Sequence, residues 1–140
     1  MKSFPKKLFC ASLFTLLAQA AVAEVAVIVH PGNADAIDKD VISQIYLAKT
    51  KSFPGGKTAI PLDRAEGSAT RIEFITKVID KDEAQMKAYW SRLIFTGKGV
   101  PPKVMDSDAE VKDLVARNPD AIGFIDAGAV DSTVKVVGTF

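Results

Sequence analysis

The sequence is poor in the side chains that bind metals or form disulfides. Its 140 residues include one cysteine, Cys10, and one histidine, His30. A zinc site would lack its usual ligands, and a serine–histidine–aspartate arrangement would need His30 to lie beside a serine distant in the sequence, such as Ser68. We see no catalytic constellation, which favours a binding protein over an enzyme. Without disulfides, the fold must be stabilised by its hydrophobic core.

The sequence also lacks an excess of charge of either sign. Eighteen Lys and Arg residues stand against 17 Asp and Glu residues, and 48% of all residues are hydrophobic. A nucleic-acid partner would require a strongly basic domain, so this balance argues against one. No internal repeat, low-complexity tract or long linker divides the chain. The composition is typical of a single soluble domain.

The longest apolar run lies at the N-terminus. Three lysines precede the apolar stretch 8–20, and Ala21-Val22-Ala23 has the A-x-A form of a cleavage site. This order predicts a secretory signal peptide over residues 1–23 and a single domain over residues 24–140. Cleavage would remove Cys10 and leave 15 basic and 17 acidic residues. We therefore expect a periplasmic or secreted protein.

The apolar periodicity predicts strands that alternate with helices. Short apolar runs predict strands at residues 25–29, 58–62, 121–125 and 133–137. Apolar residues at helical spacing predict four helices. Three begin after a capping residue, namely Asp38, Ser68, and Asp106 or Ser107, and the remaining one covers residues 86–94. The apolar positions of the second and third helices are Ile72, Ile75, Ile79, Met86, Trp90, Leu93 and Ile94. This alternation predicts an α/β fold, a sheet with helices packed on its faces.

Acidic side chains gather where the predicted helices begin or end. The clusters are Asp38 with Asp40, Asp80 with Asp82 and Glu83, and Asp106 with Asp108. They lack the spacing of a calcium-binding loop. We expect them to act as helix caps and as partners of the helix dipole.

The stretch DRAEGSATR, residues 63–71, carries two arginines at a predicted helix start. Ser68 is explained as an N-cap that contributes about 1 kcal/mol. Alternatively, its hydroxyl and the N–H groups of Ala69 and Thr70 face a bound oxyanion. Arg64 favours the anion site, because it lies at the carboxyl end of a predicted strand, where ligands of α/β proteins bind. Arg71 is either an accessory charge or a solvated residue.

Three segments resemble the periplasmic phosphate-binding proteins of ABC transporters. Residues 64–70, RAEGSAT, resemble the R-x-x-G-S-G-T segment of that family. Residues 45–49, IYLAK, resemble its I-[FY]-L-G-K segment, and residues 118–124, NPDAIGF, resemble its T-P-G-x-I-G-Y segment. The segments occur in the family's order, although Ala48, Ala69 and Asp120 each replace a family glycine. The resemblance implies a single lobe of a type II periplasmic-binding-protein fold, a mixed sheet flanked by helices.

The resemblance also implies a site for inorganic phosphate or a similar oxyanion. Arg64 would pair with the anion, and Gly67 would form the tight turn before the helix. Ser68 and Thr70 would donate through hydroxyl and backbone groups, and Ala69 through its N–H. An ABC permease would be the partner, and no cofactor is implied. Because only the second of two closing lobes is resembled, we expect affinity near the millimolar range, about −4 kcal/mol.

A rival hypothesis is an interaction module with a vestigial anion site. The same lobe would then be a scaffold that docks a permease, a sensor protein or a second copy as a homodimer. Glu66 favours this hypothesis, because a carboxylate beside the anion would repel it. A hydrolase is a more distant alternative, since it needs a base near Ser68 and His30 is the sole candidate.

Overall fold

The computed structural model describes residues 23–140. The predicted signal peptide therefore lies outside the described residues, except for its last position. The strands are β1 (Val25–Val29), β2 (Ile60–Arg64), β3 (Lys103–Met105), β4 (Ala121–Asp126) and β5 (Lys135–Thr139). The helices are α1 (Lys39–Tyr46), α2 (Ala69–Phe74), α3 (Glu83–Phe95) and α4 (Asp108–Arg117). A π-helical turn, η1 (Ile75–Ile79), continues α2, and a 3₁₀ turn, η2 (Ala127–Ala129), follows β4.

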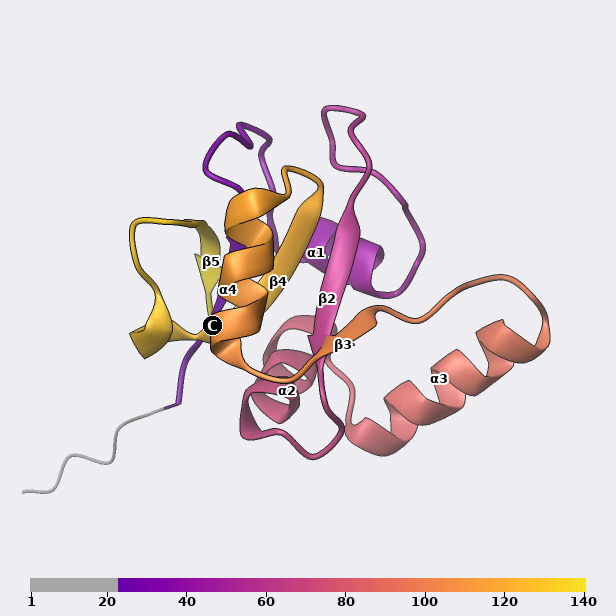
Figure 1. Cartoon of the computed structure of the whole chain (residues 1–140). Helices are drawn as coiled ribbons and strands as arrows, with labels where there is room; N and C mark the ends of the chain where they lie inside the picture. Colours follow the sequence, from indigo (N-terminus) through magenta and orange to yellow (C-terminus); the bar gives the residue numbers. More distant parts are fainter. Residues whose placement is uncertain (1–22) are drawn as a thin grey trace, which may run out of the picture.

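The five strands form one mixed sheet in the order β3-β2-β4-β1-β5. Strand β2 pairs in parallel with β3 and β4, whereas β1 pairs antiparallel with β4 and β5. Figure 1 shows α4 in front of the sheet, α1 behind it, and α3 extending outward beyond the β3 edge. The predicted α/β class and mixed sheet are thus confirmed.

The hydrophobic core has two parts, one on each face of the sheet. Side chains alternate along a strand, so Val25, Val27 and Val29 of β1 pack in one cluster and Ile28 in the other. The larger cluster also contains apolar side chains of α1, α2, η1 and α3. The smaller cluster is covered by α4 through Val111 and Val115. Both faces of the central strands are therefore buried.

The predicted helix caps are present. The side chains of Asp38, Ser68 and Ser107 each accept a hydrogen bond from a backbone N–H in the first turn of α1, α2 and α4. Asp82 caps α3 and forms a capping box with Gln85. These polar side chains set where the helices begin, because they satisfy otherwise unpaired amide groups.

Several boundaries and orientations differ from the sequence prediction. Strands β2 and β5 each begin and end two residues later than expected, and β3 was not predicted. Ile72 is 43% exposed, because the inward face of α2 is instead formed by Arg71 and Phe74. Ile94 is 54% exposed, because the end of α3 extends past the edge of the sheet (Figure 1).

The ladder between β2 and β4 is short and is supplemented by a side chain. It contains only the pairs Ile60 with Ala121 and Pro61 with Ile122, and proline has no N–H to donate. The hydroxyl of Tyr46 lies 2.7 Å from the carbonyl oxygen of Leu62 and 3.2 Å from that of Ile122. Burial, followed by the charge of Asp63, raises the pKa of Tyr46 well above its ordinary value. The hydroxyl therefore remains a hydrogen-bond donor.

Candidate functional site

Arg64 lies at the carboxyl end of the parallel strand β2, as predicted. Its side chain is 14% exposed, and Nη1 donates to Oδ1 of Asp108 at the start of α4. The other oxygen of Asp108 accepts a hydrogen bond from the amide of Asp126, 3.2 Å away. Asp108 is therefore more than the helix-dipole partner expected from the sequence. It holds the arginine at the edge where three parallel strands end.

One polar atom of Arg64 has no partner. Its Nε is buried and makes no hydrogen bond to any of residues 23–140. A buried N–H of a charged group without an acceptor is costly, and native proteins contain few of them. The guanidinium can therefore donate one more hydrogen bond, for example to an oxyanion, while it remains paired with Asp108.

The predicted turn and helix start follow directly after Arg64. Gly67 has a φ of +84°, a conformation that favours glycine. The Ser68 hydroxyl accepts a long hydrogen bond, 3.5 Å, from the amide of Arg71. The amides of Ala69 and Thr70 have no hydrogen-bond acceptor within residues 23–140. These donors are the groups that an anion at a helix start would use.

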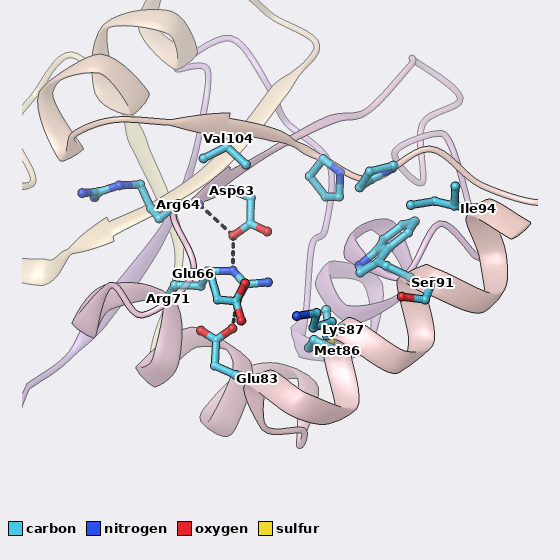
Figure 2. Close-up of a pocket in the computed structure, with 13 residues that line it drawn as sticks. Asp63, Arg64, Glu66, Arg71, Glu83, Met86, Lys87, Ser91, Ile94 and Val104 are labelled. Atoms are coloured by element: carbon cyan, nitrogen blue, oxygen red, sulfur yellow. Dashed lines mark hydrogen bonds and ion pairs between the residues drawn. The ribbon is translucent and has the colours of Figure 1, made fainter.

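The five predicted residues do not line one cavity. Arg64 lines a cavity of about 330 Å³, whereas Ala69 and Thr70 line a separate hollow of about 50 Å³. Gly67 and Ser68 lie on the chain between the two. The smaller hollow also contains acidic side chains, namely Glu24, Glu73 and Asp126. Figure 2 shows the Arg64 side chain pointing away from the larger cavity.

Arg71 is neither solvated nor an accessory charge at the surface. It is 9% exposed and pairs with Asp63, with 3.1 Å from Nε to Oδ1, and with Glu83 (Figure 2). Glu83 also accepts from the amide of Gly67, 3.4 Å away. Burial opposes the charge of Arg71, but the two carboxylates outweigh it and raise its pKa. This cluster fixes the start of α2 against α3.

Asp63 and Glu83 both pair with Arg71, and the side chain of Asp63 is mostly buried, with 14% of it exposed. Burial raises the pKa of Asp63 above its ordinary value, although Arg71 and the amide of Arg64 counteract this effect. The larger cavity is thus bordered by Asp63, Glu66 and Glu83 on one side. Its far wall is apolar and includes Trp90.

Two of these interactions were missed from the sequence. Arg71 has the same helical spacing as Phe74, Ile75 and Val78, so its burial could have been inferred from that face. The pairing of Asp108 with Arg64 could not, because it depends on β3, which places the start of α4 beside the end of β2. Within residues 23–140, no group of His, Cys, Asp or Glu side chains is arranged to hold a metal ion.

Comparison with known proteins identifies relatives in fold. Searches against family models and curated proteins found no match. Among solved structures, an ABC-type phosphate transport receptor from Vibrio cholerae has a TM-score of 0.63 and 21% identity over 82% of this chain. A protein described as a phosphate ABC transporter substrate-binding protein from Clostridium perfringens, with bound phosphate, has a TM-score of 0.63 and 22% identity over 82%. PstS from Borrelia burgdorferi has a TM-score of 0.61 and 14% identity over 83%.

The chain spans less than half of each of these structures. The matched shares are 45% of the Vibrio protein, 44% of the Clostridium protein and 47% of the Borrelia protein. None of the helices among residues 23–140 combines the length and apolarity that a membrane span requires. At these sequence identities, the similarity concerns the fold. The chain has the mixed α/β architecture of a single lobe of phosphate substrate-binding proteins.

Proposed function

We propose that this protein binds phosphate or a similar oxyanion at the start of α2, without catalysing a reaction. Arg64 supplies the charge, and the turn at Gly67 brings the chain into the helix. Ser68 and Thr70 donate through hydroxyl and backbone groups, and Ala69 donates its N–H. The phosphate-binding proteins with the same lobe architecture support this proposal, as does the resemblance of residues 64–70 to their anion-binding segment.

The observation that carries the proposal is the unpartnered Nε of Arg64. A buried guanidinium edge without an acceptor favours an incoming anion, because the anion would satisfy a hydrogen bond that the chain leaves unmade. The unpaired amides of Ala69 and Thr70 lie five and six residues after Arg64 in the sequence and provide further hydrogen-bond donors. Together these groups offer positive charge and N–H donors at the carboxyl edge of the sheet.

The charges around the site limit its strength. Asp108 already neutralises part of Arg64, and Asp126 and Glu73 border the free helix start. An anion at this open edge remains partly in water, where ion pairing contributes little. We therefore expect dissociation constants near the millimolar range, about −4 kcal/mol.

The cellular setting follows from the same hypothesis. We infer that residues 1–23 direct export and that residues 24–140 act as one domain in the periplasm. An ABC permease would be the protein partner, as the transport proteins with this architecture suggest. Mass spectrometry of the exported protein would identify its N-terminus, and a start well beyond residue 24 would contradict this division.

The anion site is tested by titration with phosphate and sulfate, followed by amide NMR. We expect phosphate to shift the amide signals of Ala69 and Thr70, with a millimolar midpoint. Arg64→Ala should weaken binding by about tenfold or more, the equivalent of one charge-assisted hydrogen bond. Arg117→Ala is the matched control, because Arg117 is an exposed arginine of α4 paired with Asp113. Equal binding by the two variants would refute the site.

A further inference from the structure

One stretch of the chain, residues 84–105, carries positive charge only. It covers most of α3, the following loop and β3, and its charged residues are Lys87, Arg92, Lys98 and Lys103. All four are exposed and none forms an ion pair with any of residues 23–140. The other described residues together contain six more acidic than basic side chains. We call residues 84–105 the basic segment.

The same segment exposes large apolar side chains. Phe95 is 92% exposed, Val100 84%, Val104 56% and Ile94 54%. Single exposed apolar residues are common on protein surfaces, but four within residues 94–104 form a group. They make up most of the strongly exposed apolar side chains in the described part of the chain. Of these, Phe95 ends α3 and Val100 follows in the loop that also carries Lys98, so this end of the segment presents both apolar and positive side chains.

The shape of the basic segment distinguishes it from the rest of the molecule. Figure 1 shows the end of α3 and the loop after it projecting beyond the β3 edge. Behind the loop lies a cavity of about 460 Å³ lined by Trp90, Val100 and Pro102, among others. Its lining includes two charged side chains, Lys51 and Lys98, and both are positive. The projecting end is therefore apolar and cationic on its surface and in the hollow behind it.

We propose that the basic segment docks on a lipid bilayer that contains anionic phospholipid. Phe95 and Val100 insert into the interface between headgroups and acyl chains, while Lys98 and Lys103 contact the headgroups. Long lysine side chains can reach headgroup charges from beside a buried apolar residue. The acidic remainder of the molecule is repelled by the same surface, which fixes the orientation of the protein on it.

Charge argues against the other occupants. In a symmetric pair of two copies, the four cations would face four cations, so a second copy is a poor partner for this face. An acidic protein would match the charge, but a projecting end offers little of the broad complementary surface that stable protein interfaces require. None of the five residues of the proposed anion site lies in the basic segment, so the two proposals stand or fall separately.

The test is sedimentation of the full chain with vesicles of phosphatidylcholine, alone or mixed with phosphatidylglycerol. We expect at least about tenfold stronger binding to the anionic vesicles, since each cation near such a surface contributes severalfold. Binding should weaken as salt is raised. The double variants Phe95→Ser with Val100→Ser and Lys98→Gln with Lys103→Gln should each lose most of this binding. Because every variant shares residues 1–22, differences among them report the basic segment.

Matched controls make the outcome decisive. Lys57→Gln with Val136→Ser applies the same kinds of change to exposed residues outside the segment and should bind as wild type does. Arg64→Ala should also retain vesicle binding, and its loss would indicate headgroup capture at the anion site instead. Wild-type levels of binding by the segment variants would overturn the proposal. So would a dimer in light scattering that Phe95→Ser dissociates, or a wild type that ignores anionic vesicles and instead binds an acidic polypeptide.

Discussion

Arg64 and Arg71 carry the same charge and lie three residues before and four residues after the turn at Gly67, yet their surroundings differ. Arg71 is surrounded by the carboxylates of Asp63 and Glu83, and its charge is neutralised within the fold. Arg64 meets one carboxylate and keeps a buried N–H without an acceptor. The first arginine therefore holds elements together, and the second keeps an N–H donor that no group among residues 23–140 accepts.

Replacing Arg71 should destabilise the protein strongly. Arg71→Met leaves Asp63 and Glu83 without their cation in a partly buried setting, and losing one partner of such a cluster should cost about 2–3 kcal/mol. Arg117→Met removes an exposed pair within one helix and should cost about 0.5 kcal/mol or less. Urea unfolding followed by circular dichroism measures both values. Similar losses in the two variants would show that the Arg71 cluster does not stabilise the fold.

Asp63 should make stability depend on pH in the acidic range. Because burial raises its pKa in the folded state, the folded protein binds this proton more tightly than the unfolded chain does. The corresponding stability is present below the unfolded pKa, about 3.9, and is lost as pH rises through the folded pKa. Carboxyl NMR titration should locate the Asp63 pKa above 3.9. A lower value would mean that the ion pair with Arg71 outweighs burial.

At the scale of elements, the end of α1 contains a residue in an unfavourable conformation. Ala48 has a φ of +55°, in the left-handed region. Its amide bonds to the carbonyl of Ile45, and the next amide, of Lys49, bonds to that of Gln44. This pattern is a Schellman motif, whose left-handed position is usually glycine. The sequence thus keeps the motif while lacking its usual residue.

Ala48→Gly should therefore stabilise the protein. Relief of the left-handed strain is worth about 1–2 kcal/mol, and the greater freedom of glycine in the unfolded chain offsets part of it. We expect a net gain of about 0.5–1 kcal/mol in urea unfolding. Ala88→Gly, at an exposed position inside α3, should instead cost about 1 kcal/mol. A loss in both variants would show that Ala48 is unstrained.

The helices and most strands could be predicted from sequence because their signals are local. Asp38, Ser68 and Ser107 mark helix starts, and the run at 25–29 is apolar throughout. Strand β3 has three residues and lies at the edge of the sheet with Val104 exposed, so it has no apolar signal. The pairing of Asp108 with Arg64 depends on the position of that strand, so it could not be predicted once the strand was missed. Local patterns do not report contacts that arise from sheet order.

At the scale of the whole molecule, residues 23–140 contain two core clusters that share their central strands. β1 and β4 contribute side chains to both clusters, so the packing on the two faces of the sheet depends on the same two strands. Figure 1 shows the helices of both faces resting on the same strands. This arrangement supports the inference that residues 24–140 form one domain.

Unfolding should accordingly occur in one cooperative step. We expect a single calorimetric transition whose calorimetric and van't Hoff enthalpies agree. Circular dichroism and the fluorescence of Trp90, which packs in the larger cluster, should report the same midpoint. Two separated transitions, or probes with different midpoints, would contradict a single domain.

The shared hydroxyl of Tyr46 links the interior to the edge of the sheet where Arg64 lies. It spans the gap where β2 and β4 lose their ladder, two residues before Arg64. Its ring lies against Phe74, with centroids 4.6 Å apart, and Phe74 stacks on Phe124 at 4.0 Å. A change in how these rings pack would move the end of β2 and so aim the guanidinium of Arg64 differently. Affinity at the proposed anion site would then respond to substitutions at residues that do not contact the anion.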